Sequence, residues 1–294
     1  MVQNNSVRAK NIVLTKLIHT THMGFGKVNR LVGFVLVLTC VIRAEDFRPQ
    51  VIAHRGGAAL RPENTIPAFQ YAMDLKVPIL EFDMNVTADG QIVIHHDSSV
   101  NSSVCQADPK SDVRPGPIGL LKLAELLQFD CGSFIRPKSP LYKSVPGQRM
   151  ATLDDFFSLV KNQPVMLLGE TKMPDADAAY APDPQKFASM IDAAVRKYGL
   201  EDRFILQSFD YRTIDAMWKI NPKIKRCLLG ARRYKPDYLS LAKKHHATHL
   251  MLRFDDAPAE EFQELRIQGL KIFSGTSNLP SEWEKYQELK IDGI

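Results

Sequence analysis

The 294-residue sequence is poor in cysteine and has neither an internal repeat nor a low-complexity tract. Its four cysteines form no CxxC pair and no cysteine–histidine pattern of the kind that binds zinc. These absences exclude structural zinc domains, disulfide-rich scaffolds and solenoid repeats. What remains is a chain long enough to bury a full-sized core as one or two domains.

An excess of basic residues is also absent from most of the chain. The net charge of +5 arises from residues 1–44, which hold six basic residues and no acidic one. The other 250 residues carry 32 basic and 33 acidic side chains. A nucleic-acid-binding domain usually concentrates lysine and arginine on one face. We therefore expect no nucleic acid among the partners.

No hydrophobic run is long enough to span a membrane, which takes about 20 residues. The most apolar stretch, LVGFVLVLTCVI, has 12 residues, from 31 to 42. Lys27 and Arg30 precede it and Ala44 follows it, as in a signal peptide. We predict that residues 1–44 are a leader, and that the mature chain is periplasmic or secreted, without stable membrane insertion.

The leader is too long for an ordinary signal peptide when it is counted from Met1. A start at Met23 leaves a conventional 22 residues, so we expect translation to begin there. An uncleaved anchor is one alternative. A lipoprotein attached through Cys40 is another, although Thr39 fits the preceding position poorly.

Three cysteines follow the predicted leader, namely Cys105, Cys131 and Cys227. An odd number cannot form a complete disulfide framework. One bridge is compatible with an exported protein. The sequence does not indicate which pair would form it.

From residue 45 onward, short apolar runs alternate with amphipathic segments. This order predicts parallel strands joined by helices, with both faces of the sheet covered. The expected strands are 51–53, 79–83, 165–170, 204–208, 224–229, 249–254, 271–274 and 291–294. The expected helices are 67–75, 185–198, 211–220, 238–245, 260–268 and 282–289.

Eight such strands would close a (β/α)8 TIM barrel, and an open doubly wound sheet is the alternative. Residues 101–148 interrupt the alternation, because they are long, rich in Pro, Ser and Lys, and helical only near 120–129. We predict a single domain over 45–294 with a small insertion at 101–148, after the second or third strand. Residues 92–95 could be a further barrel strand, which leaves nine candidates for eight places.

Acidic side chains stand at the ends of two expected strands. Glu81 and Asp83 lie two residues apart in PILEFDMN, and Glu170 ends the 165–170 strand. The carboxyl ends of parallel barrel strands meet at one rim, so three carboxylates would repel one another there. One divalent cation relieves this repulsion, and an all-oxygen ligand set favours Ca²⁺ or Mg²⁺.

Two histidines are predicted to flank these acids. His54 follows the 51–53 strand, and His96 follows the turn signal Asp89-Gly90. If those two turn residues form the whole loop, His96 stands opposite Asp83 with its side chain on the same face. The hairpin would then deliver His96 next to the metal.

The motifs together resemble the glycerophosphodiester phosphodiesterase family. The resemblance rests on His54-Arg55-Gly56, Pro62-Glu63-Asn64-Thr65, Glu81-Phe82-Asp83, Asp89-Gly90 and His96-Asp97, followed by GETK at 169–172 and LQSFD at 206–210. It covers about residues 50–294 and implies a (β/α)8 barrel. The implied reaction converts glycerophosphodiesters to sn-glycerol 3-phosphate and an alcohol, within glycerol and lipid metabolism.

The resemblance also implies roles for individual residues. Glu81, Asp83 and Glu170 would hold one divalent cation, Ca²⁺ rather than Mg²⁺, as in exported family members. His54 and His96 would form the acid/base pair, and Arg55 and Lys172 would bind phosphate. The attacking group could be the glycerol hydroxyl, which would give a cyclic phosphate that water opens.

Asn64 has more than one expected role. It could bind the substrate phosphate, orient His54, or cap the helix that begins near Ile66, a position for which Thr65 is equally suited. Glu63 could orient Arg55, or it could lie in the outer shell of the metal site, beyond the residues that bind the ion directly.

The chain departs from the family pattern in places, and other functions stay open. FSGTSN at 273–278 stands where a Trp-Thr-Val-Asn strand end is usual, and the chain ends at Ile294. A lysophospholipase D or sphingomyelinase-D-like enzyme on the same barrel is the alternative activity. A binding protein for phosphodiesters without catalysis is a third. The head group and the oligomeric state do not follow from the sequence.

Overall fold

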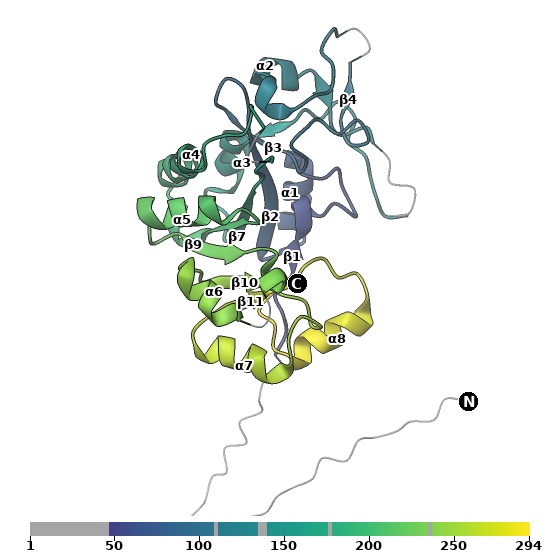
Figure 1. Ribbon diagram of the computed structural model, residues 1–294. Helices are drawn as coiled ribbons and strands as arrows, with labels where there is room; N and C mark the ends of the chain where they lie inside the picture. The colour runs from purple at the N-terminus through teal and green to yellow at the C-terminus, as the bar shows by residue number, and fades with distance from the viewer. Residues whose placement is uncertain (1–46, 109–110, 135–139, 176–177, 235–236) are drawn as a thin grey trace, which may run out of the picture. The chain divides into compact units, whose positions relative to one another are not determined.

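The computed structural model describes residues 47–108, 111–134, 140–175, 178–234 and 237–294 (Figure 1). The predicted leader, with Met23 and Cys40, lies outside these residues. No described helix has the length and apolar character needed to cross a membrane.

A closed parallel barrel forms the centre of the described chain and confirms the predicted fold class. Its strands follow one another in sequence order, from β1 next to β2 and β7 through to β11. The strands are β1 (Ile52–Ala53), β2 (Ile79–Val86), β7 (Met166–Thr171), β8 (Phe204–Ser208), β9 (Lys225–Leu228), β10 (His249–Met251) and β11 (Lys271–Phe273).

Residues 291–294 supply the eighth position and close the barrel. Gly293 forms parallel bridges with Phe273 beside β11 and with Gln50 ahead of β1. Backbone hydrogen bonds run from Gln50 N to Asp292 O at 2.9 Å and from Asp292 N to Ile272 O at 2.8 Å. The parallel order is the one predicted from the alternation of strands and helices, and the closure through Gly293 rules out the open sheet.

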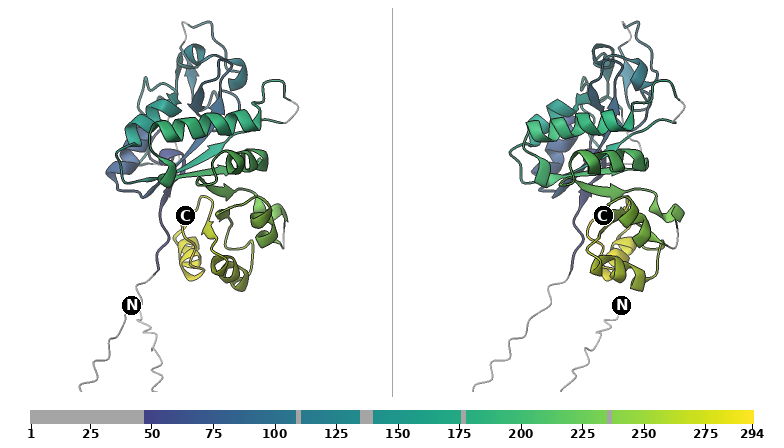
Figure 2. Two further views of the ribbon diagram at one scale, coloured as in Figure 1. Left: turned by 90° about the vertical axis from the view of Figure 1, so that its left-hand side faces the viewer. Right: turned by 60° about the vertical axis from the view of Figure 1, so that its left-hand side comes forward.

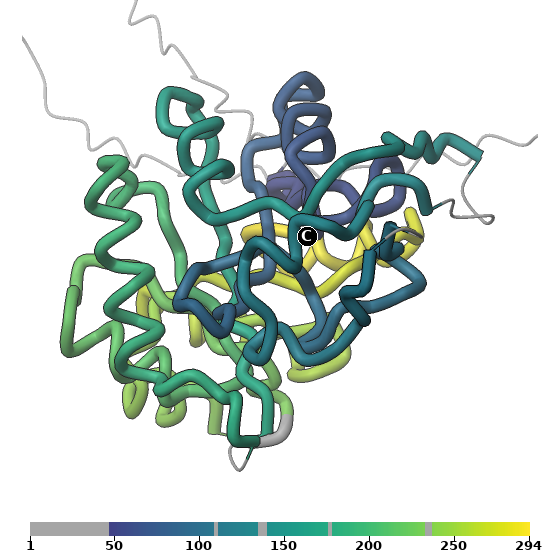
Figure 3. Tube along the Cα trace, turned by 90° about the horizontal axis from the view of Figure 1, so that it is seen from above, coloured from purple at the N-terminus to yellow at the C-terminus, as the bar shows by residue number. Residues whose placement is uncertain are grey.

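Helices surround the strands (Figures 2 and 3). They are α1 (Ile66–Asp74), α3 (Leu153–Val160), α4 (Pro184–Lys197), α5 (Tyr211–Ile220), α6 (Tyr238–Lys244), α7 (Ala259–Ile267) and α8 (Pro280–Glu288). Figure 2 shows α4 and α5 side by side. The periodicity of the sequence did not predict α3, although GQRMATLDD at 147–155 resembles a family segment that leads into a helix. The helix begins at a capping box between Thr152 and Asp155.

Short 3-10 turns complete the barrel loops. They are η1 (His54–Gly56), η3 (Glu201–Arg203) and η4 (Ala231–Tyr234). Of these, η1 directly follows β1 and carries the His54-Arg55 motif at the carboxyl end of that strand.

The segment between β2 and α3 leaves the barrel and builds a small lobe, labelled at α2 and β4 in Figure 1. Its elements are β3 (Ile92–Ile94), β4 (Gln106–Ala107), η2 (Ile118–Leu120), α2 (Leu123–Leu126), β5 (Phe129–Asp130) and β6 (Ala151–Thr152). β3 runs antiparallel to both β2 and β6, so it is not a barrel strand. Residues 92–95, the ninth candidate for the eight strands, therefore lie outside the barrel.

The lobe has its own apolar core, cross-linked by a disulfide between Cys105 and Cys131. Phe129, Leu126 and Ile118 pack around that pair and are fully buried. Cys227 is a free, buried thiol in the barrel.

Alternation along the strands separates the barrel interior from the layer beneath the helices. Ile79, Leu168 and Ile205 pack together inside the barrel. Leu80, Phe82 and Leu206 pack outward against helical residues such as Phe156, whose ring centroid lies 4.7 Å from that of Phe82. The residues two and four positions beyond an interior residue of a strand therefore determine what lines the barrel mouth.

Candidate active site

The interior positions at the carboxyl ends of β2, β7 and β8 are polar. Along β2 the interior residues are Ile79, then Glu81 and Asp83, so the apolar floor gives way to carboxylates. Register pairs Asp83 with Glu170 on β7, and Glu170 with Gln207 on β8. The same two-residue periodicity thus brings four polar side chains from three strands to one place.

Glu81, Asp83 and Glu170 converge as the sequence predicted. Each offers a carboxylate oxygen, and these oxygens lie within 4.8 Å of one another. All three residues are buried, with exposed fractions of 4%, 1% and 7%. Oxygens bound to one cation at about 2.0–2.6 Å can be up to about 5 Å apart, so the spacing suits a single ion.

The electrostatics of the cluster also favour a cation. Burial, and then the charges of Asp83 and Glu170, raise the pKa of Glu81 well above its usual value. Burial raises the pKa of Glu170 to about 7, even though Lys172 opposes the shift. These carboxyls resist ionisation because like charges share a dry site, and a divalent cation removes that cost.

Among the described residues, one buried oxygen beside the cluster, Gln207 Oε1, has no hydrogen-bond partner. Gln207 Nε2 donates to Glu81 Oε1 at 3.0 Å, so its amide oxygen lies next to the carboxylates. Buried oxygens are normally paired, and an amide oxygen is of the type that binds hard cations. The residues present therefore fit a divalent ion.

Lys172 and Arg55 are the cations of the site. Lys172 Nζ lies 2.5 Å from Glu170 Oε1 and 3.1 Å from Asp83 Oδ1. Arg55 Nε lies 3.7 Å from Asp83 Oδ2, and its Nη1 donates to Glu63 Oε1 at 2.8 Å. Glu63 thus orients Arg55, one of the two roles expected for it. If all are ionised, four carboxylates face two cations, an imbalance that one divalent ion cancels.

A left-handed turn after β1 positions Arg55. Its φ and ψ are 53° and 37°, a conformation that is uncommon for any residue except glycine. The turn aims the Arg55 backbone N–H at Glu81 Oε2, 2.6 Å away. The glycines of the motif continue the turn, because Gly56 and Gly57 have φ of 75° and 97°.

Asn64 is held against Asp83. Its Nδ2 donates to Asp83 Oδ2 at 2.8 Å, and its Oδ1 accepts from the Asp83 backbone N–H at 3.3 Å. The N-cap position of α1 belongs to Thr65, whose side chain makes no capping bond and instead donates to Pro62 O. The expected cap is therefore wrong for Asn64, and phosphate binding by it stays a prediction.

His54 lies at the rim of the barrel. Its Nδ1 is 3.1 Å from Thr276 Oγ1 in the loop after β11. Burial, and secondly the Arg55 charge, lower the pKa of His54 to about 4. The imidazole is therefore neutral at neutral pH and able to accept a proton.

The predicted hairpin register is wrong by one residue. Val86 pairs with Ile92, and Gly90 N donates to Thr87 O at 3.0 Å, so the loop has three residues instead of two. The Thr87 hydroxyl favours this longer loop, because it accepts from Gln91 N and donates to Asp89. Gly90 takes the left-handed position that such loops require.

The register shift places His95, not His96, opposite Asp83. His95 N donates to Asp83 O at 3.0 Å, and the His95 ring is buried. His96 follows at the next position, where its Nδ1 lies 2.6 Å from Asp97 Oδ1. Burial alone would raise the pKa of Asp83, but Lys172 and then the hydrogen bond from Asn64 outweigh it and lower that pKa.

Two residues of the site had no predicted role. Gln207 carried a signal, because it lies in the LQSFD motif and continues the alternation of FILQS as the acids do on their strands. Thr276 carried none, since it belongs to the 273–278 segment that departs from the family pattern. A cavity of about 780 Å³ opens beside the cluster, lined by Glu170, Lys172, Phe209, Tyr211, Arg212 and His245 among others.

Comparison with known proteins agrees with this geometry. The model of the glycerophosphoryl diester phosphodiesterase family matches residues 54–294. A glycerophosphodiester phosphodiesterase of Caldanaerobacter subterraneus is 27% identical over 245 residues, 83% of this chain and 92% of its own.

Solved structures share the fold. A phosphodiesterase of Oleispira antarctica, in complex with the product sn-glycerol-3-phosphate, has a TM-score of 0.70 at 22% identity. The match covers 84% of this chain and 92% of that one. A glycerophosphodiester phosphodiesterase of Thermotoga maritima has a TM-score of 0.61 at 20% identity, over 84% of this chain and 93% of its own.

Proposed function

The chain belongs to the glycerophosphoryl diester phosphodiesterase family, and we propose that it hydrolyses glycerophosphodiesters to sn-glycerol 3-phosphate and an alcohol with one divalent cation and two histidines. The observation that carries this proposal is the convergence of Glu81, Asp83 and Glu170 within 4.8 Å, beside the Arg55 and Lys172 cations. The product complex of the Oleispira antarctica relative supports the choice of product.

Glu81, Asp83 and Glu170 would hold the cation, with Gln207 Oε1 next to them. When bound, the ion supplies Lewis-acid stabilisation of negative charge on phosphate, worth several kcal/mol. We favour Ca²⁺ over Mg²⁺, as the family resemblance of the sequence implies for an exported chain, and the all-oxygen donors suit either ion. Binding would also offset the burial and the repulsion that raise the pKa of Glu81 and Glu170.

Arg55 and Lys172 are the groups placed to bind the anionic phosphate oxygens. Both are partly buried, with side-chain exposures of 20% and 13%, and both already face carboxylates. Because a cation in the cluster would take over those carboxylates, each side chain could turn its N–H groups to phosphate. Charge-assisted bonds of this kind are among the stronger hydrogen bonds.

His54 and His96 carry the proton transfers. One takes the proton from the attacking hydroxyl or water, and the other donates a proton to the departing alkoxide. A single histidine cannot serve both sides of an in-line displacement at once. Each positioned acid or base contributes typically about 10²–10⁴-fold. The general acid and the general base are thus His54 and His96. The pH–rate profiles of the two single variants show which histidine is the acid and which is the base.

The direct test measures glycerol 3-phosphate released from glycerophosphocholine by the wild type and by His54→Ala and His96→Ala. We expect each variant to retain less than a tenth of wild-type kcat. Glu284→Gln, an exposed change on α8, is the matched control and should retain full activity. A histidine variant with more than a tenth of the activity would contradict the two-histidine assignment.

A lysophospholipase D activity is the second candidate. It is favoured by Phe209, which lines the cavity beside Glu170 and is 56% exposed, so that an acyl chain could contact it there. The lobe also exposes leucines such as Leu120 and Leu127. Turnover of lysophosphatidylcholine at least equal to that of glycerophosphocholine would establish it over the first function.

We also propose that residues 1–44 are an export leader and that residues 45–294 work outside the cytoplasm. The disulfide between Cys105 and Cys131 supports this, because such bonds persist in oxidising compartments. N-terminal sequencing of the mature protein tests the leader. A mature chain that still begins at Met1 or Met23 would contradict cleavage.

A further inference from the structure

His96 is held by its neighbour in the sequence. Its Nδ1 lies 2.6 Å from Asp97 Oδ1. A carboxylate at this atom favours the tautomer with the proton on Nδ1, which leaves Nε2 free to exchange a proton with substrate. The two side chains are 34% and 40% exposed, so water competes for both. Without a further support, this pair would be mobile.

Asn101 supplies that support. Its Nδ2 donates to the other oxygen of the carboxylate, Asp97 Oδ2, at 2.6 Å. With one oxygen held by Asn101, the other is aimed at His96. Burial would raise the pKa of Asp97, but the bonds from His96 and Asn101 outweigh it and lower that pKa. The carboxylate is therefore charged at neutral pH.

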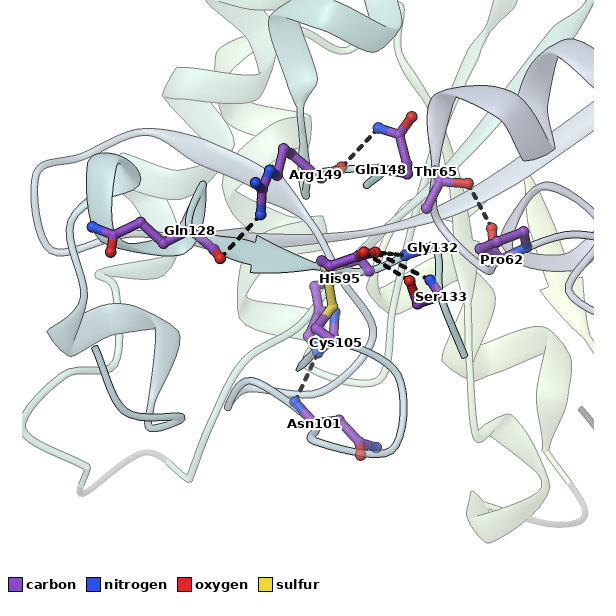
Figure 4. The surroundings of a disulfide bond; sticks show 12 residues. Pro62, Thr65, His95, Asn101, Cys105, Gln128, Gly132, Ser133, Gln148 and Arg149 are labelled. Atoms are coloured by element: carbon purple, nitrogen blue, oxygen red, sulfur yellow. Dashed lines mark hydrogen bonds between the residues drawn. A yellow bond between two sulfur atoms is a disulfide. The ribbon is translucent and has the colours of Figure 1, made fainter. Parts of the chain in front are cut away.

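Further hydrogen bonds hold the backbone and the side chain of Asn101 in place. Its backbone N–H donates to His95 Nε2 at 3.4 Å, as Figure 4 shows beside the disulfide. Its backbone oxygen accepts from Val104 N and Cys105 N, at 2.9 and 2.8 Å. Its Oδ1 accepts from the Ser103 hydroxyl at 2.6 Å. The turn from 101 to 105 thus ends on the cysteine that cross-links the lobe.

We propose that Asp97 and Asn101 are positioning residues that fix the tautomer and orientation of His96, and that the cross-linked lobe acts on catalysis through them. This inference rests on the proposed function of His96. It gives the 101–148 insertion a role in the reaction. Asn101, the first residue of the insertion, connects the His96–Asp97 pair to the turn that ends at the disulfide.

The test compares Asp97→Asn and Asn101→Ala with Ser102→Ala, an exposed change in the same turn. Asn at position 97 would present an amide N–H₂ either to His96 or to the Asn101 donor, so one bond must fail. We expect kcat on glycerophosphocholine to fall by about a hundredfold for Asp97→Asn and about tenfold for Asn101→Ala. KM should stay within threefold, and Ser102→Ala should match the wild type.

A second readout does not depend on turnover. Two-bond ¹H–¹⁵N spectra at pH 8 report the tautomer of each histidine, and His96→Gln identifies the resonance. We expect the Nδ1-protonated form in the wild type and a shift toward the Nε2-protonated form in Asp97→Asn. Thermal unfolding of each variant confirms that it is folded.

The outcomes separate this inference from the proposed function. A wild type that hydrolyses the substrate, with both variants within twofold of Ser102→Ala in kcat, overturns the positioning role. A larger KM with unchanged kcat overturns it as well. A wild type without hydrolysis overturns the proposed function, and the tautomer measurement then still decides whether Asp97 and Asn101 orient His96.

Discussion

Asp83 is the side chain on which the candidate site converges. Asn64 holds one of its oxygens and its backbone N–H, while Lys172 faces the other oxygen and Arg55 lies 3.7 Å away. Only 1% of its surface is exposed, so bulk solvent contributes little to stabilising its charge. Its charge is therefore sustained entirely by neighbouring groups, of which a bound cation would be the strongest.

Replacing Asp83 with Asn should remove one ligand and one negative charge without changing the size of the side chain. We expect kcat/KM on glycerophosphocholine to fall by about 10³-fold, equivalent to several kcal/mol. The cation concentration needed for half-maximal activity should rise as well. Glu284→Gln, on the exposed side of α8, controls for loss of a carboxylate. Unchanged cation dependence in Asp83→Asn would remove this residue from the ligand set.

His249, at the start of β10, determines part of the stability at acid pH. Burial, reinforced by Lys225, lowers its pKa to about 4. Its ring packs against Phe273 at 4.9 Å between centroids. Because the unfolded chain binds this proton below about pH 6.5, stability should fall as the pH falls from there toward 4. The expected loss is about 3 kcal/mol.

Urea unfolding of the wild type and of His249→Gln at pH 7 and pH 4.5 measures this contribution. The difference in unfolding free energy between the two proteins should shrink at the lower pH. Equal pH dependence in both proteins would show that His249 is not responsible. The other charged groups near the ring are the same in both proteins, namely Lys225, Lys271, Arg226 and Asp292.

At the scale of elements, the lobe is a separate packing unit joined to the barrel by β3 and β6. Its core is small, and the Cys105–Cys131 bond closes a loop with a sequence separation of 26. Loops of this length gain roughly 2–4 kcal/mol from a disulfide, chiefly through the unfolded chain.

Changing both cysteines to serine should therefore lower the free energy of unfolding of the lobe by about 2–4 kcal/mol. Hydrogen exchange of amides in β4 and β5 should increase, while those of β8 should change little. Cys227→Ala, which leaves no buried hydroxyl in the apolar barrel interior, is the control, since this thiol is not part of the bond. Unaltered exchange in β4 and β5 would mean that packing alone holds the lobe.

Most elements could be predicted because their local pattern and their tertiary environment agree. FILQS and the 211–220 helix fall where the sequence placed them, since apolar strands and amphipathic helices are what a barrel buries. The hairpin register could not be predicted, because the Thr87 side chain extended the loop by one residue. The disulfide pair depended on contacts within the lobe that have no local signature.

The candidate site was predictable to a similar degree. The three carboxylates follow from periodicity and from the common rim of a parallel barrel. Contacts between distant segments do not, such as Thr276 with His54 or Asn64 with Asp83. No pattern within one segment reports a partner that folding brings from another.

At the scale of the whole molecule, the barrel depends on its last four residues. Residues 291–294 bridge β11 and the segment ahead of β1, and Ile291 is fully buried. Deleting them would expose the edges of β1 and β11, whose unpaired backbone groups invite association. We expect the truncated chain to lose cooperative thermal unfolding and to aggregate. Conversely, a deletion variant with wild-type Tm would show that the closing segment is dispensable.

The central claim is that one divalent cation, bound by Glu81, Asp83 and Glu170, is required for hydrolysis of a glycerophosphodiester. The most direct measurement is the rate of glycerol 3-phosphate release from glycerophosphocholine before and after EDTA treatment, and again after Ca²⁺ or Mg²⁺ is restored. The expected result is loss of activity with EDTA and recovery with the cation, more fully with Ca²⁺. A rate that EDTA leaves unchanged would contradict the account.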